Sequence, residues 1–193
     1  MKLPTREQCF EYYKKFETPE NILEHVKKVN EIANFIAKKL NEKLKEQQNK
    51  KNNIINLELV DRVSLIHDLD KWFTLKNKEF LHGHITKEFL EKEGYPELGF
   101  YAKQHIIEDA ELPFKTWEEK IVAYADKRAN GSKIVTLKDR FDYINKRYVA
   151  IDIEKRKFAE KLSYEIEKEI FDVINIKPED LEKEIEIEKN KTE

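Results

Sequence analysis

The sequence is poor in glycine, proline and cysteine. It has four glycines, five prolines and one cysteine in 193 residues. Sheets and tight turns depend on glycine and proline more than helices do, so their scarcity favours an all-α fold. The single cysteine, Cys9, excludes an internal disulfide and is typical of a reducing compartment. We therefore expect a cytoplasmic protein.

Long hydrophobic runs are also missing. No apolar stretch approaches the roughly 20 residues that cross a bilayer, and the opening residues MKLPTRE lack the apolar segment of a signal peptide. We expect no membrane association. Charge of one sign is not in excess either, since 37 basic and 39 acidic residues leave a formal net charge of −2. A nucleic-acid groove usually brings a basic excess, so we do not expect nucleic acid as a partner.

Charged residues are abundant and apolar residues are used sparingly, each class making up 39% of the chain. This balance suits amphipathic helices that each bury one apolar stripe in a shared core. The length favours one domain. We assign residues 1–175 to one compact multi-helix bundle and residues 176–193 to a charged C-terminal tail, expected to be a frayed helix or disordered.

Apolar periodicity, caps and breakers predict where the helices lie. The expected helices cover residues 5–16, 20–40, 57–66, 84–93, 97–107 and 117–130, and further helices follow after residues 136 and 151. Gly94 and Gly131 mark the ends of the fourth and sixth of these. Residues 45–53, rich in lysine and asparagine, are typical of a flexible loop.

The histidines stand out by their placement rather than their number. There are five of them: His25, His67, His82, His84 and His105. His25 and His67 lie in or beside apolar stripes, Asp68 follows directly, and Asp126 lies on the apolar face of its helix. Buried charges are expensive unless a partner compensates them. Imidazole and carboxylate together suit divalent Fe, Mn, Co, Ni or Zn, with Mg a further candidate, so a metal ion would supply that partner.

Five separated stretches resemble the HD superfamily of metal-dependent phosphohydrolases, and they occur in that family's order. They are EHVKKV (24–29), LIHDLDK (65–71), LHGHITKEFLEKEGYPE (81–97), AKQHI (102–106) and EEKIVAYADKR (118–128). The resemblance covers residues 20–150 and looks closest to bacterial diadenosine tetraphosphate hydrolases and their archaeal relatives. It implies an HD-type helical domain that hydrolyses a phosphate ester or anhydride of a nucleotide or dinucleoside polyphosphate with a metal-activated water.

The resemblance also implies a role for each matching residue. A first metal would be held by His25, His67, Asp68 and Asp126, and a second by His82 and His105 with Asp68 bridging. One or two divalent ions would therefore be the cofactor. Asp68 would also act in catalysis by orienting the water, and Lys71 would bind substrate phosphate. Lys127 and His84 are further candidates for substrate binding, and His84 also for proton donation.

The sequence departs from the family pattern in one region. Asp70 stands where many members have glycine, and Thr86 and Lys87 replace a small Gly-Ala pair. We expect the larger Thr86 and Lys87 side chains to alter the packing of the helix over residues 84–93 and, through it, the binding of the second metal. The spacing to Gly94 favours His82 over His84 as the ligand.

Several alternatives stay open. The histidines would be structural in a non-enzymatic helical binding module, and the lysines would then be ordinary solvated side chains. A di-iron oxygenase on the same fold is another alternative, since a few members of the HD superfamily use a di-iron centre to activate dioxygen. Basic and aromatic residues alternate between Lys138 and Arg147, which suggests nucleic-acid contact, although aromatics at helical spacing are more often core. The expected partner is a small phosphorylated molecule, and helices beyond residue 150 either buttress the bundle or form a homodimer.

Overall fold

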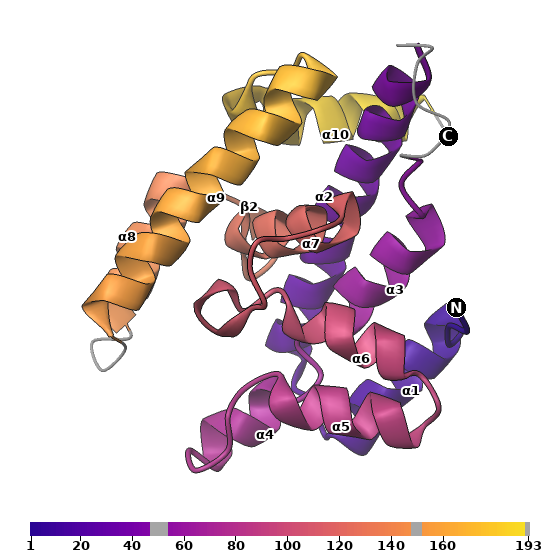
Figure 1. Ribbon diagram of the computed structural model, residues 1–193, viewed down its shortest axis with the longest axis vertical. Coiled ribbons are helices and arrows are strands. Elements are labelled where there is room, and N and C mark those ends of the chain that lie inside the picture. The colour runs from indigo at the N-terminus through magenta and orange to yellow at the C-terminus, as the bar shows by residue number, and fades with distance from the viewer. Residues whose placement is uncertain (47–53, 148–151, 192–193) are drawn as a thin grey trace.

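The computed structural model describes residues 1–46, 54–147 and 152–191. The prediction of an all-α bundle is confirmed, because regular structure in these ranges is helical apart from one short hairpin. Figure 1 shows the helices arranged around a common core. The predicted flexible loop falls, from residue 47 to residue 53, outside the described residues.

The elements follow one another along the chain with few irregular residues between them. They are α1 (Arg6–Lys15), α2 (Glu20–Glu46), α3 (Leu57–Ile66), α4 (Lys71–Lys76), α5 (His84–Lys92), α6 (Pro96–Lys103), the 3-10 turn η1 (Ile107–Asp109), α7 (Trp117–Lys127), β1 (Ala129–Asn130), β2 (Lys133–Ile134), α8 (Leu137–Arg147), α9 (Ile153–Ile174), the 3-10 turn η2 (Pro178–Asp180) and α10 (Leu181–Asn190).

Helix α2 forms the centre of the bundle and packs against α3, α7 and α9. Its predicted apolar stripe is confirmed: Val26, Val29, Ala33, Ile36 and Leu40 are completely buried. These positions recur every three or four residues and therefore share one face of the helix. The site is built at one end of this stripe.

Helices α5 and α6 cross closely, and a glycine on α6 makes the approach feasible. A Cβ added at Gly99 would lie 2.9 Å from the carbonyl oxygen of Lys87 and 3.2 Å from its Cα. The close contact therefore requires glycine at this point. Helix α5 carries Thr86 and Lys87 here, so the space at this crossing comes from Gly99 on α6.

The helix predicted over residues 117–130 extends three residues too far at its C-terminal end. Helix α7 ends at Lys127, and residues 129–134 form an antiparallel hairpin with Ala129 opposite Ile134. Gly131, at a φ of 58°, turns the chain in the left-handed conformation that favours hairpins. The fifth predicted helix also stops early, at Lys103, where the Gln104 side chain bonds to the segment that follows.

Of the two expectations for the C-terminal tail, a frayed helix or disorder, the structure shows a helix, and this helix is docked on the bundle. Residues 181–190 form α10, which buries Leu181 and Ile185, one helical turn apart. Ion pairs join it to α2, since Lys39 Nζ lies 3.0 Å from a Glu188 oxygen. A helix this short is marginal alone in water, so its order depends on this docking.

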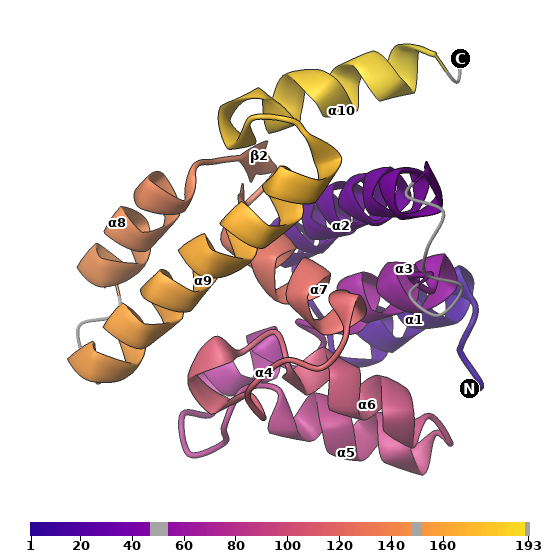
Figure 2. The same cartoon turned by 45° about the horizontal axis from the view of Figure 1, so that its top comes forward.

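Helices α8 and α9 lie side by side and project from the rest of the bundle, as both views show (Figures 1 and 2). In both views, the ends of α8 and α9 that point away from the bundle lie on the same side of the molecule as α4 (Figures 1 and 2). Among the described residues, no helix is both long enough and apolar enough to cross a membrane.

Candidate metal centre

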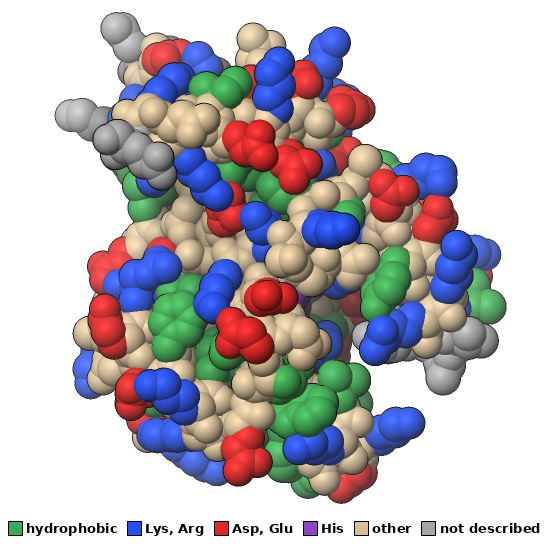
Figure 3. All heavy atoms as spheres, turned by 180° about the vertical axis from the view of Figure 1, so that it is seen from behind, with side chains coloured by type: hydrophobic (Ala, Val, Ile, Leu, Met, Phe, Trp, Pro, Cys, Tyr) green, Lys and Arg blue, Asp and Glu red, His purple; other side chains and the backbone are tan. Residues whose placement is uncertain are grey.

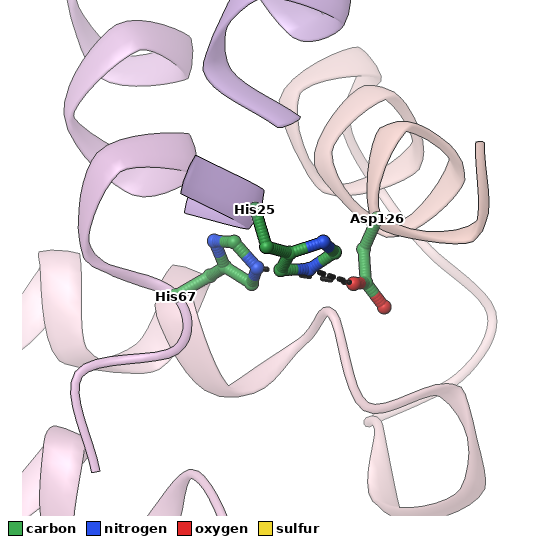
Figure 4. A group of neighbouring side chains, drawn as sticks. All are labelled: His25, His67 and Asp126. Atoms are coloured by element: carbon green, nitrogen blue, oxygen red, sulfur yellow. Dashed lines mark hydrogen bonds and ion pairs between the residues drawn. The ribbon is translucent and has the colours of Figure 1, made fainter. Parts of the chain in front are cut away.

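Three helices contribute side chains to one buried cluster, drawn in Figure 4. His25 comes from α2, His67 from the C-terminal end of α3 and Asp126 from α7, and all three point toward one another. Asp126 Oδ1 lies 3.0 Å from His25 Nε2 and 3.9 Å from His67 Nε2. One ligand atom from each of the three lies within 4.8 Å of the others. Such a group can hold a metal ion.

A second group shares His67 with the first. It consists of His67, Asp68 and His105, whose ligand atoms again lie within 4.8 Å of one another. Asp68 Oδ1 lies 3.4 Å from His105 Nε2, and Asp68 Oδ2 lies 3.8 Å from His67 Nε2. The structure therefore brings together the residues predicted for the first metal and begins a second group beside them.

Backbone carbonyls orient two of these imidazoles. His67 Nδ1 donates to the carbonyl of Ser64 at 2.8 Å, and His105 Nδ1 donates to the carbonyl of Ala102 at 2.6 Å. Each acceptor lies three residues earlier, at the end of the preceding helix. With the proton fixed on Nδ1, each ring turns its basic Nε2 toward the cluster, as is usual for metal-binding histidine.

His67 shows most directly that the cluster suits a cation. Its Nε2 is buried and has no hydrogen-bond partner among the described residues. Burial lowers the pKa of His67 to about 3, so the ring is neutral and this nitrogen carries a free lone pair. A buried polar atom without a partner costs about 1–3 kcal/mol. A divalent metal would satisfy it, and imidazole with carboxylate is a donor set that transition metals prefer.

His82 is held by two carboxylates. Its Nε2 lies 2.8 Å from Asp68 Oδ1, and its Nδ1 lies 2.6 Å from Asp70 Oδ1. Burial opposes the charging of this ring, but the hydrogen bonds to the two aspartates outweigh that effect and raise the pKa of His82. Its Nε2 is also 3.2 Å from His105 Nε2. His82 thus reaches the second group through Asp68, on the side predicted for a second metal.

Both carboxylates of the cluster remain ionised in spite of their burial. Burial alone would raise the pKa of Asp68, but Lys71 and the neighbouring histidines outweigh it and lower that pKa well below its usual range. The same balance lowers the pKa of Asp126, where Lys127 and His25 are the main stabilising groups. The cluster therefore presents negative charge and the neutral imidazole of His67 to an incoming cation.

The two predicted lysines lie at the site in different ways. Lys127 Nζ lies 2.7 Å from Asp126 Oδ2 with both side chains 8% exposed, so this lysine is a buried ion-pair partner. Lys71 Nζ lies 3.7 Å from Asp68 Oδ1, and its side chain is 32% exposed. Lys71 therefore stands at the border between the cluster and solvent.

His84 is not brought to the cluster. Its Nε2 lies 2.8 Å from Asp109 Oδ2 in η1, and its side chain is 39% exposed. It does not line the pocket that opens on the cluster. The predicted roles of His84 in substrate binding and proton donation therefore have no support in its position.

A pocket of about 490 Å³ opens directly on the cluster. His82, His105 and Asp126 form part of its wall, together with Lys71 and Lys127. Figure 3 shows a hollow on the back face of the molecule in which a small histidine surface is visible, with hydrophobic side chains gathered below it. The cluster is therefore buried but reachable, as a site for a small molecule requires.

Sequence reasoning missed the pocket residues that lie outside the motifs. Arg140 of α8 lines the pocket, and its Nη2 lies 3.8 Å from Asp126 Oδ1. Lys78 and Phe80, in the segment between α4 and α5, line it as well. The alternation of basic and aromatic residues around Arg140 marks α8 in the sequence, but nothing there indicates that this helix faces the histidines.

No model of a known family, no curated protein and no solved structure matches this chain. What the chain does must therefore be inferred from the chemistry of its cluster and pocket.

Proposed function

We propose that the chain is an HD-type metal-dependent phosphohydrolase that cleaves a phosphate ester or anhydride of a nucleotide or dinucleoside polyphosphate. The observation that carries the proposal is the buried His67 Nε2, which accepts no hydrogen bond from the part of the chain that the structure describes and faces carboxylates and other imidazoles beside an open pocket. The motif order of the sequence supports the same function, because these residues occupy the positions that hold metal in the HD superfamily.

His25, His67, Asp68 and Asp126 would hold the first ion, and His82 and His105 a second one. A divalent metal, when bound there, supplies Lewis-acid chemistry: it makes a water molecule more acidic and neutralises charge on phosphoryl oxygens. Fe, Mn, Co, Ni and Zn all suit this set of ligands.

Asp68 is placed to serve both groups. Its Oδ2 lies 3.7 Å from His25 Nε2 and its Oδ1 lies 2.8 Å from His82 Nε2, so the carboxylate stands between the two sets of imidazoles. The ionised carboxylate accepts hydrogen bonds and would orient the attacking water toward the pocket. We therefore expect the replacement of Asp68 to abolish hydrolysis.

Lys71 and Lys127 would each use their positive charge, but on different partners. Lys71, partly exposed at the pocket, would bind a phosphoryl oxygen of the substrate as a point charge. Lys127 is paired with Asp126 and so keeps that carboxylate ionised and in place. The expected division is substrate binding for Lys71 and positioning for Lys127.

The test combines metal analysis of the purified protein with phosphate release from a panel of nucleotides that includes diadenosine tetraphosphate. We expect about one or two equivalents of metal and hydrolysis that Asp68→Ala abolishes. Asp172→Ala changes an exposed carboxylate on α9 and is the matched control, which should hydrolyse normally. A folded protein that binds no stoichiometric metal, is unaffected by chelators and releases no phosphate would contradict the proposal and favour a helical binding module.

A further inference from the structure

We infer that the pocket selects a substrate with a planar apolar ring and more than one phosphate, through Phe80 and Arg140. Both residues lie outside the sequence motifs of the metal centre. The inference rests on the proposed function and names the part of the substrate that does not react.

One wall of the pocket is apolar and partly open to solvent. Phe80 and Leu75 are 46% and 43% exposed, and Ile106 and Ile144 line the same pocket. Large apolar side chains that remain exposed beside a polar cluster are typical of ligand sites. The reacting phosphate gains nothing from such a wall, so another part of the ligand must cover it.

Phe80 is the side chain best placed to bind a planar ring. Its own ring packs against Phe73, with ring centroids 5.4 Å apart and the planes tilted by 54°. This contact supports the Phe80 ring from α4 while almost half of the side chain stays exposed. A supported aromatic ring with a free surface is a stacking platform for a nucleobase or a similar group.

The charges around the pocket call for a ligand with several negative charges. Of the pocket's described lining residues, Lys71, Lys78, Lys127 and Arg140 are basic and Glu108 and Asp126 are acidic, an excess of two positive charges. A single phosphate carries about two negative charges and would balance that excess alone. One or two bound divalent ions would raise the excess, and a chain of two or more phosphates is then the better match.

Arg140 is the residue we assign to the second phosphate. Its Nη2 lies 3.8 Å from Asp126 Oδ1, an oxygen that His25 already contacts at 3.0 Å. Its Nη1 is 3.4 Å from the side-chain oxygen of Asn130, a long hydrogen bond. The guanidinium therefore keeps donors for a phosphate, which arginine binds in a planar two-point geometry.

The experiment measures equilibrium binding of two non-hydrolysable probes to the Mn²⁺-loaded protein by calorimetry, at equal free Mn²⁺. The probes are α,β-methylene adenosine diphosphate and methylenediphosphonate, which share the anionic group and differ in the nucleoside. We expect the nucleotide probe to bind about tenfold more tightly, because stacking on an aromatic ring contributes roughly this much.

Two variants separate the two contributions. Phe80→Ala should remove the preference for the nucleotide probe and leave the affinity for methylenediphosphonate unchanged. Arg140→Gln should weaken both probes by a similar factor of about ten, because a hydrogen bond to a charged group is lost in each case. Leu81→Ala, at an exposed neighbour of Phe80, and Lys138→Gln, on the exposed face of α8, are the matched controls and should change neither affinity.

Equal binding of the two probes by the wild type, or a preference that survives Phe80→Ala, would overturn the inference. An Arg140→Gln protein that binds both probes as the wild type does would overturn the assignment of the second phosphate. Because no turnover is involved, these outcomes are separate from failure of the proposed function, which would appear as loss of metal binding or of Asp68-dependent phosphate release.

Discussion

Asp70 and Thr86 hold each other through two hydrogen bonds in opposite directions. The Asp70 amide donates to Thr86 Oγ1 at 3.1 Å, and the Thr86 amide donates to Asp70 Oδ2 at 3.0 Å. Both side chains are completely buried. The other oxygen of the same carboxylate faces His82 Nδ1, so this pair fixes the ring that reaches Asp68.

Single and double variants test this pair. We expect Asp70→Ala to lower the free energy of unfolding by about 3 kcal/mol, because it removes the acceptor of the Thr86 amide and the acceptor of His82 Nδ1. Thr86→Ala should cost about 1 kcal/mol, because it removes the acceptor of the Asp70 amide. Each bond joins the side chain of one residue to the backbone of the other, so the double variant should come close to the sum of the two. Urea unfolding at pH 7 measures all four proteins, and an Asp70→Ala variant that loses less stability than Thr86→Ala would contradict this ranking.

His67 and His84 should differ sharply in their effect on metal binding. We expect His67→Ala to lose bound metal, whereas His84→Ala keeps it, because His84 pairs with Asp109 away from the cluster. Metal at 100 times its dissociation constant stabilises the folded state by about 2.7 kcal/mol. For a chain of this length that corresponds to a rise in thermal midpoint of about 5–10 °C.

Metal analysis and thermal unfolding with and without chelator measure this difference. Chelation should lower the midpoint of the wild type and of His84→Ala, and leave His67→Ala unchanged. A chelator effect that persists in His67→Ala would place the metal elsewhere.

Acid should destabilise the metal-free protein below pH 6.5. The pKa of His67 is about 3 in the folded state because of burial, against 6.5 for a free histidine. Between these values the unfolded chain binds the extra proton, so stability falls as the pH falls, by at most about 1.4 kcal/mol per pH unit for one group. The raised pKa of His82 does not offset this loss, because its stabilising contribution is fully present below pH 6.5.

Urea unfolding from pH 4.5 to pH 7 in the presence of chelator measures this slope. His67→Phe removes the titrating group and should flatten the curve in that window, with His84→Phe as the exposed control. A variant at His67 that keeps the wild-type slope would assign the effect to other groups.

Substitutions of Lys127 and Lys71 should affect different properties, the first the stability of the fold and the second the binding of substrate. Lys127→Met breaks a buried ion pair with Asp126 and should lower the free energy of unfolding by about 3 kcal/mol. Lys71 is partly exposed, so Lys71→Met should cost less than about 1 kcal/mol. Its effect should appear instead as a rise in KM for a phosphorylated substrate. Steady-state kinetics and urea unfolding on both variants check the division, which equal effects on stability would contradict.

Local sequence patterns were sufficient for the fold class and most helix positions. Thr5 and Gln8 form the capping box that begins α1, and Gly94 directly follows the segment that ends α5. Such features depend on neighbours within one helical turn, so they are visible in the sequence. The docking of helix α10 was not foreseen, because it depends on contacts with α2 such as that of Lys39 with Glu188, 149 positions apart, which no local pattern contains.

The candidate site was predictable where its residues lie in motifs and not where tertiary packing decides. The placement of His25, His67 and Asp126 in one cluster follows the motif order, although the three come from separate helices. Arg140 escaped because the docking of α8, rather than any local pattern, brings it to the pocket. The spacing to Gly94 already favours His82 over His84 as a ligand, but only the fold shows that His84 pairs with Asp109 away from the cluster.

The contact of Gly99 with the Lys87 backbone shows that the need for a small residue belongs to a crossing of two helices, not to a position in one of them. In this chain α6 supplies the space, since a Cβ at Gly99 would lie 2.9 Å from the carbonyl oxygen of Lys87. A sequence pattern that requires small residues on α5 alone would not recognise this chain. A pattern that considers α5 and α6 together, and accepts a small residue on either, would recognise it.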